Sequence, residues 1–275
     1  MPEDFLTVIG HINQDVIIGI DDIPKFGSTE VKNLKILLGG TGANIALVAS
    51  RLDVPLTLLS KVSQKFPEEL LSPLHHRNIK LKLERSDEEG PVCYIIDARE
   101  EQIAFMFQGP MNSPGSLYSI ESRYCHFATS NPKWILSLMD RCKGKKVFDP
   151  GQEISYRWSL EELRIAMKKS DIIILNRNEY DYSRDIIPDG KDLIITLGKE
   201  GCSYNGKIIR SKRQSGRSTV GAGDAFRAGL YASLYRGNDI LKACECANTV
   251  AGYYVEYERS LDLLDWRVLC EDNDV

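Results

Sequence analysis

The residues with the clearest chemical potential lie late in the chain, in the segment Gly221-Ala222-Gly223-Asp224. A helical pattern follows them, and a helix that starts there leaves backbone N–H groups unpaired at its positive end. Glycines let a phosphate approach such a backbone closely. Asp224 would lie beside that anion, which repels a carboxylate unless the carboxylate accepts a proton or assists a metal. The segment suggests phosphoryl transfer with Asp224 as general base, although an acidic residue that only complements the helix dipole fits the same spacing.

Two earlier segments carry side chains that suit hydroxyl groups. Gly39-Gly-Thr-Gly-Ala-Asn44 leads from a strand pattern into a helix pattern, and the Asn44 amide can both donate and accept hydrogen bonds. Asn13 and Asp15 follow the first strand and point to the same side if that strand continues, which suits a vicinal diol. Taken alone, each segment is explained as well by a turn, because Gly, Asn and Asp are common turn residues.

A third glycine-rich segment, Gly201–Lys207, has the outline of a P-loop, but we reject that interpretation. Ile208 follows Lys207, where a P-loop needs Ser or Thr to bind Mg²⁺. Asn205-Gly206 instead predicts a type I′ hairpin. The sequence also offers no zinc site and no Ser/His/Asp set, so the two glycine-rich helix starts remain the candidates for chemistry.

The elements that would position these residues alternate between strands and helices. The expected strands are Phe5–Gly10, Leu56–Ser60, Tyr124–Ala128, Lys146–Phe148, Asp171–Leu175 and Asp192–Thr196. The expected helices are Ala43–Leu52, Phe66–His76, Pro132–Arg141 and Ser159–Lys169, the last opening with a Ser159/Glu162 capping box. This alternation predicts an α/β fold with a doubly wound, mostly parallel sheet flanked by helices. Such sheets bind ligands beyond the carboxyl ends of their strands.

Four further segments alternate at strand period without a helix between them. They are Asp15–Ile20, Glu30–Leu38, Val92–Ile96 and Ile103–Phe107, within lid regions at about 15–38 and 92–108. We expect them to form a small antiparallel sheet, which serves either as a lid or as a dimer face, although two hairpins without such a role fit the pattern equally well. An apolar face on that sheet would favour a homodimer over a monomer.

Composition narrows the classes of protein. The chain has 275 residues, of which 43% are hydrophobic and 27% charged, which is typical of a globular protein. A net charge of −4 argues against nucleic-acid binding by bulk charge, and no apolar run could span a membrane. The acidic start differs from a secretory signal, so we expect a cytoplasmic protein whose seven cysteines are reduced thiols.

Taken together, the glycine-rich segments Gly39–Asn44 and Thr219–Asp224 resemble the paired signatures of the ribokinase-like (PfkB) carbohydrate and nucleoside kinases. Further matches follow in the family's order: Gly10–Asp15, Asp149–Gln152, Asn178–Asp181 and Thr196–Gly201. The similarity runs from about residue 6 to residue 257. The motif Thr219–Asp224 is specific to the family. The other motifs are weak individually, but their occurrence in the family's order argues against a chance match.

The resemblance implies a single kinase domain over residues 1–275, with ATP as co-substrate and Mg²⁺ as cofactor. It makes Asp224 the base and assigns the anion hole to Gly221 and to the amides of Ala222 and Gly223. The residues implied for the sugar or nucleoside are Asn13, Asp15, Gly40, Thr41 and Asn44. Those implied for the nucleotide are Asn178, Thr196, Gly198, Gly201 and Asn248. Asp181 replaces the family's Glu and would hold the metal through water.

Departures from the family pattern bear on the acceptor. Thr41 stands where ribokinases carry Lys, and Phe105–Met111 is similar to a lid segment of archaeal nucleoside kinases. We therefore expect transfer of the γ-phosphoryl group of ATP to a hydroxymethyl group of a nucleoside, with a free sugar as the alternative. A noncatalytic sugar- or nucleotide-binding paralogue also remains open. A Rossmann-type oxidoreductase does not, because no glycine fingerprint follows the first strand.

A last expectation concerns monovalent cations. Many ribokinase-like enzymes carry Asp where this chain has Ser218, and that carboxylate helps a loop to coordinate K⁺. The stretch Val255–Ser260, where a second cation loop is usual, contains no glycine and includes Arg259. Both halves of a cation site are weakened, so we predict that K⁺ changes turnover little.

Overall fold

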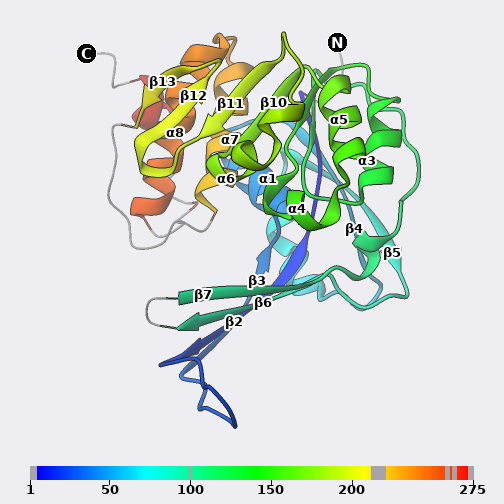
Figure 1. The fold of residues 1–275 in the computed structure, drawn as a ribbon, viewed down its shortest axis with the longest axis vertical. Helices are drawn as coiled ribbons and strands as arrows, with labels where there is room; N and C mark the ends of the chain where they lie inside the picture. The colour runs from blue at the N-terminus through cyan, green and yellow to red at the C-terminus, as the bar shows by residue number, and fades with distance from the viewer. Residues whose placement is uncertain (1–4, 99–100, 212–220, 258–260, 262–264, 272–275) are drawn as a thin grey trace.

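The computed structural model describes residues 5–98, 101–211, 221–257, 261 and 265–271. A large sheet with helices on both faces forms the main body, and a smaller sheet projects from it (Figure 1). This is the α/β architecture that the alternating pattern predicts.

The large sheet has nine strands in the order β13-β12-β11-β10-β9-β8-β1-β4-β5. The strands are β1 (Leu6–Ile9), β4 (Leu56–Ser63), β5 (Ile79–Ser86), β8 (Tyr124–Phe127), β9 (Lys145–Phe148), β10 (Ile172–Asn176), β11 (Asp192–Thr196), β12 (Gly201–Tyr204) and β13 (Lys207–Arg210). Neighbours pair in parallel except at the β11-β12-β13 edge, where pairing is antiparallel. The β12–β13 turn has Asn205 at φ 47° and Gly206 at φ 83°, which confirms the predicted hairpin.

Helices cover both faces of this sheet. They are α1 (Thr41–Arg51), α2 (Glu68–Leu71), α3 (Pro132–Met139), α4 (Ile154–Arg157), α5 (Leu160–Lys169), α6 (Arg177–Ser183), α7 (Ala222–Tyr235) and α8 (Ile240–Glu256). Short 3₁₀ or π segments are η1 (Ser72–Leu74), η2 (Gly109–Asn112), η3 (Gly151–Glu153), η4 (Arg184–Ile186), η5 (Gly198–Glu200) and η6 (Arg267–Glu271). Within the described ranges, no helix is long and apolar enough to cross a bilayer.

The strands feed two cores because their side chains alternate between the two faces. Ile172 and Ile174 of β10 pack in the core that includes α1, α7 and α8, whereas Ile173 and Leu175 pack in the core that includes α3 and α5. Helix α5 begins at the capping box of Ser159 and Glu162, as predicted.

The small sheet has four strands in the order β3-β2-β6-β7. They are β2 (Asn13–Ile20), β3 (Asn33–Gly39), β6 (Val92–Ala98) and β7 (Glu101–Phe107). The pairs β2–β3 and β6–β7 are antiparallel as expected, and the central pair β2–β6 is parallel. We call this four-stranded unit the lid sheet.

Chain connectivity creates the place for a ligand. From β1 the chain runs outward through β4 and β5, and from β8 it runs the other way through β9, β10 and β11. The strand order therefore reverses between β1 and β8, and in open α/β sheets ligands bind beyond the carboxyl ends at such a switch point. The segments that follow β1, β8, β9 and β10 all reach this edge.

Two expectations from the sequence need correction. The helix expected at Phe66–His76 is two short segments, α2 and η1, because Pro73 cannot continue the α-helical hydrogen-bond ladder. The cysteines are not all reduced: Cys125 of β8 and Cys142 form a disulfide, because the fold brings these side chains together across 17 residues. Five other cysteines are free and buried.

Candidate active site

A cavity of about 750 Å³ lies at the switch point, between the main body and the inner face of the lid sheet. This volume is in the range that small-molecule sites occupy. All but one of the residues predicted from the sequence line it: Asn13, Asp15, Gly40, Thr41, Asn44, Asn178, Thr196, Gly198, Gly201, Gly221, Ala222, Gly223, Asp224 and Asn248. The exception is Asp181.

Helix α7 points its N-terminus into this cavity. It begins after Gly221, which has φ 80°, a left-handed conformation that favours glycine. A side chain there would also press on Tyr254, since an added Cβ would lie 3.2 Å from that ring. The first amides of α7 have no partner within the helix, so they can bind an anion.

Helix α1 also starts at the cavity, and it meets the first turn of α7. Gly40 precedes it with φ 95°, and an added Cβ would lie 2.6 Å from the His11 carbonyl oxygen, so only glycine fits. Asn44 Nδ2 donates to Asp224 Oδ2 at 2.8 Å. This hydrogen bond leaves the second carboxylate oxygen of Asp224 in a fixed orientation.

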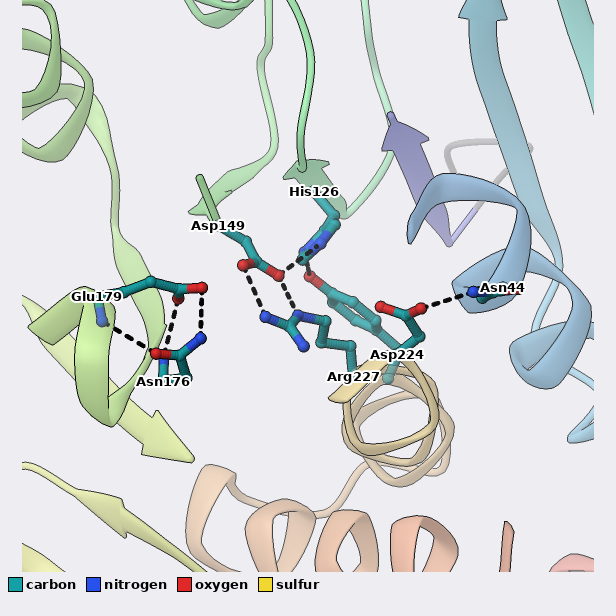
Figure 2. Close-up of polar contacts among 8 residues, drawn as sticks. Asn44, His126, Asp149, Asn176, Glu179, Asp224 and Arg227 are labelled. Atoms are coloured by element: carbon teal, nitrogen blue, oxygen red, sulfur yellow. Dashed lines mark hydrogen bonds and ion pairs between the residues drawn. The ribbon is translucent and has the colours of Figure 1, made fainter. Parts of the chain in front are cut away.

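A buried ionic network of Arg227, Asp149 and His126 lies next to Asp224 (Figure 2). Arg227 donates from Nε and Nη2 to the two carboxylate oxygens of Asp149, with Nη2 to Oδ1 at 2.7 Å. His126 Nε2 lies 3.3 Å from Asp149 Oδ2, and His126 Nδ1 lies 2.8 Å from the Tyr231 hydroxyl. Residues 126, 149 and 231 are almost fully buried.

The charges of this network settle its protonation. Burial alone would raise the pKa of Asp149, but the Arg227 charge and the hydrogen bonds from His126 and Arg227 outweigh it and hold that pKa at about 2. Burial lowers the pKa of His126, more than the neighbouring Asp149 raises it, which favours the neutral imidazole. The Asp149–Arg227 pair is therefore fully charged at neutral pH.

A second acidic side chain reaches the cavity from the end of β10. Glu179 and Asn176 form a capping box at the start of α6, in which Glu179 Oε2 accepts from Asn176 N at 2.8 Å. Burial, together with the charge of Asp149, raises the pKa of Glu179 to about 7. Both Asn176 and Glu179 line the cavity, and the sequence reasoning missed both.

Asp181 does not share this position. The Asp181 side chain is exposed and is not among the residues that line the cavity. Asp181 lies two positions after Glu179 on α6, so it is on the opposite side of the helix and faces solvent. The signal for the alternative was present: Asn176-Arg-Asn-Glu179 has the same Asn-x-x-acid spacing and follows directly on the strand. No group of three or more His, Cys, Asp or Glu side chains that could hold a metal occurs among the described residues.

The far side of the cavity is built from β11, the turn after it and α8. Thr196 ends β11, Gly198 begins η5 with φ 61°, and Gly201 follows η5 with φ 106°. Asn248 of α8 donates from Nδ2 to the Ile209 carbonyl oxygen at 2.9 Å, which ties α8 to β13. Ser218 and Thr219 lie outside the described residues, as does 258–260.

Under the lid sheet, the cavity wall includes a buried His11 and Glu153 that sequence reasoning did not assign. Burial, assisted by the Arg157 charge, lowers the pKa of His11 to about 3, so its imidazole is neutral. Within the described part of the chain, His11 Nε2 and Asn13 Oδ1 have no hydrogen-bond partner. Such atoms can form hydrogen bonds with the hydroxyl groups of a ligand.

Comparisons with known proteins agree with this geometry. The family model of the pfkB carbohydrate kinases matches residues 3–266. A nucleoside kinase of Thermoplasma acidophilum is 34% identical over 92% of this chain and 90% of its own length, and one of Methanothermobacter thermautotrophicus is 30% identical over the same shares.

A solved structure gives the same relationship in three dimensions. The crystal structure of a proposed ribokinase from Thermoplasma acidophilum superposes with a TM-score of 0.85 at 34% identity, covering 97% of this chain and 95% of the other. The family match over nearly the whole chain, the related sequences and the related structure all indicate the same family. The chain belongs to the pfkB family of carbohydrate kinases, and it is an ATP-dependent kinase of nucleosides or sugars.

Proposed function

We propose that this kinase transfers the γ-phosphoryl group of ATP to a hydroxymethyl group of a nucleoside. The observation that carries this choice is the division of the cavity wall. Hydrogen-bonding side chains gather at the two helix starts and at Asn13 and Asp15 of β2. Strands β6 and β7 contribute the apolar Ile95, Ala104 and Met106, together with Cys93 and Gln102. A free sugar needs only the polar part, but a nucleobase needs an apolar surface as well. The relatives named nucleoside kinases support the same choice.

In the proposed reaction Asp224 is the general base. The acceptor oxygen forms a bond to the γ-phosphorus, the bond from that phosphorus to the bridging oxygen of ADP breaks, and the hydroxyl proton moves to Asp224. Asn44 orients the carboxylate through its hydrogen bond to Oδ2. The amides of Ala222 and Gly223 at the positive end of α7 stabilise the charge on the transferred group.

We assign acceptor binding to Asn13, Asp15, Gly40 and Thr41, which lie with Asn44 along one wall. On the opposite wall, Thr196, Gly198 and Gly201 would bind the nucleotide, together with Asn178 and Asn248. Gly198 is favourable there, because nothing lies within 4 Å of where its Cβ would be. That open backbone lets a nucleotide approach closely.

Magnesium fits this arrangement through Glu179 rather than Asp181. Mg²⁺ in kinases is held mainly by substrate phosphates and water, with one or two carboxylates, so a cage of several acidic groups is unnecessary. Glu179 offers a carboxylate on the cavity wall, held in place by Asn176. When bound, Mg²⁺ would neutralise phosphate charge, and Glu179 would hold its water shell.

The acceptor is tested with a panel assay of the purified chain. ADP release is measured with ATP and Mg²⁺ while inosine, adenosine, guanosine, cytidine and ribose are supplied in turn, and the phosphorylated product is identified by mass spectrometry. We expect the best nucleoside to exceed ribose at least tenfold in kcat/KM, about the 1.4 kcal/mol that a base on an apolar wall readily supplies. Equal or better use of ribose would make this protein a sugar kinase.

We also propose that two copies of the chain pair through the outer face of the lid sheet. The register of the four strands puts the cavity residues on one face and a mostly apolar set of side chains on the other. That outer set includes Leu34 and Ile36 of β3, Tyr94 of β6, and Ile103, Phe105 and Phe107 of β7, all exposed. A sheet face with this many exposed apolar side chains is suited to a second copy of itself.

A further inference from the structure

Arg227 is a buried cation on the wall of the cavity, one helical turn beyond Asp224. Its side chain is only 8% exposed, although it lies among the residues that line the site. A buried charge is costly unless it is paired and hydrogen-bonded. Helix formation alone does not explain why a charged residue is buried at this position.

The pairing of Arg227 uses only part of the guanidinium. Nε and Nη2 donate to the two oxygens of Asp149 in a bidentate arrangement. The remaining nitrogen, Nη1, lies against the start of α7: a Cβ added to Gly223 would be 2.5 Å from it. A larger residue at 223 would displace this nitrogen, so the glycine keeps a place for it in the first turn.

The support for Arg227 extends two residues further. Asp149 is fully buried and lies 3.3 Å from His126 Nε2, while His126 Nδ1 pairs with the Tyr231 hydroxyl from the same helix as Arg227. Figure 2 shows the guanidinium directly below the Asp149 carboxylate, with the Asp224 carboxylate farther to the right. A side chain held in one conformation by these contacts loses little conformational entropy when a ligand binds.

We propose that Arg227 is a catalytic residue whose Nη1 donates a hydrogen bond to an oxygen of the phosphoryl group in transfer, and that Asp149 is its positioning residue. This inference rests on the proposed phosphoryl transfer at α7. Nη1 stands beside the amides that form the anion hole, where charge builds up as the γ-phosphoryl group leaves ADP. Arg227 takes no proton and forms no covalent bond, so the reaction balance is unchanged.

The main test replaces the charged pair by a neutral pair of similar size, Asp149→Asn with Arg227→Gln, which leaves no unpaired buried charge. We expect kcat to fall about 10²–10³-fold, the scale of one lost oxyanion donor, while KM for ATP changes far less. The matched control is Asp53→Asn with Arg77→Gln, an exposed ion pair of 3.1 Å outside the cavity. It should leave kcat unchanged.

A binding measurement separates catalysis from folding. ADP with aluminium fluoride and the acceptor imitates the phosphoryl group in transfer, whereas ADP alone does not. We expect the double variant to lose about 10²-fold in affinity for the aluminium fluoride complex and little for ADP. Equal losses for both, or a kcat within twofold of wild type, would overturn the proposal.

A second variant, Arg227→Lys, keeps the buried charge if the double variant does not fold. Lys has a single ammonium nitrogen in place of the three guanidinium nitrogens, so it cannot bind both Asp149 oxygens and the phosphoryl group simultaneously. We therefore expect kcat to fall at least tenfold in this variant as well. A wild-type kcat in this variant would also overturn the proposal. The assays use whichever acceptor the panel identifies, so a sugar acceptor would refute the nucleoside assignment without touching Arg227.

Discussion

Replacing Asp224 by Asn is the most direct test of the reaction, because it removes the proton acceptor and almost nothing else. The Asn44 amide now donates to Asp224 Oδ2 at 2.8 Å, and the amide oxygen of an introduced Asn can accept the same hydrogen bond. Side-chain volume is nearly unchanged, and the α7 amides stay in place. The substituted group cannot take a proton from the acceptor hydroxyl.

The expected magnitude follows from these contacts. A lost general base lowers kcat by about 10²–10⁴-fold, or about 3–5 kcal/mol in the barrier. Binding should change much less: a single hydrogen bond contributes about 1 kcal/mol net, so KM for the acceptor should stay within about fivefold. Loss of both kcat and binding to the same degree would indicate that Asp224 serves structure rather than proton transfer.

The assay is acceptor-dependent ADP formation, with ADP affinity measured by calorimetry on the same preparation. Asp140→Asn is a matched control, because Asp140 is exposed at the end of α3, where it pairs with Lys169. That variant should retain wild-type kcat. Unchanged turnover in Asp224→Asn would refute the assignment of the base.

Three further predictions concern assembly, pH and cations. Phe105→Asp in the outer lid face should convert a homodimer into a monomer by light scattering, and a monomeric wild type at about 100 μM would contradict the lid pairing. Asp149→Asn leaves the Arg227 charge buried without its partner and should lower the free energy of unfolding by about 3–5 kcal/mol at pH 7, as measured by urea denaturation. Because Arg227 depresses the pKa of Asp149 from 3.8 to about 2, that contribution is complete above pH 4 and is lost as pH falls toward 2, so a difference that grew on acidification would be inconsistent with it. Turnover with ATP and Mg²⁺ should differ little between K⁺ and tetramethylammonium at equal ionic strength, and strong activation by K⁺ would show that Ser218 still takes part in a cation site.

The main body was largely predictable because its central strands, such as β1, β4 and β10, are buried on both faces. Asp192–Thr196 coincides with β11, and the expected strand at Leu56–Ser60 forms the first part of β4. In a parallel sheet such runs are almost continuously apolar, and the glycine-rich turns that follow them mark the carboxyl edge. The lid strands were predictable for the opposite reason, since they alternate between a cavity face and an outer face.

Side-chain partners could not be predicted in the same way, because they depend on which strands become neighbours. Nothing local pairs Cys125 with Cys142, or Asp149 with Arg227 across 78 residues. The Asp-Pro segment at 149 resembled a family motif, yet no local pattern identified Arg227 as the partner of Asp149. The order β8-β9-β10 puts His126, Asp149 and Asn176 at one edge, and only that order makes Asp149 a support for Arg227.

The shift from Asp181 to Glu179 shows how a small error in an element boundary changes a chemical assignment. The sequence contains two overlapping Asn-x-x-acid pairs, at 176–179 and 178–181. The expected strand ended at Leu175, which left the choice between them open, whereas β10 ends at Asn176 and α6 begins at Arg177. A residue in the first turn of that helix faces the carboxyl edge, and one two positions later has turned by about 200°. The acidic group that caps the helix is therefore also the one that lines the cavity, and it is Glu179.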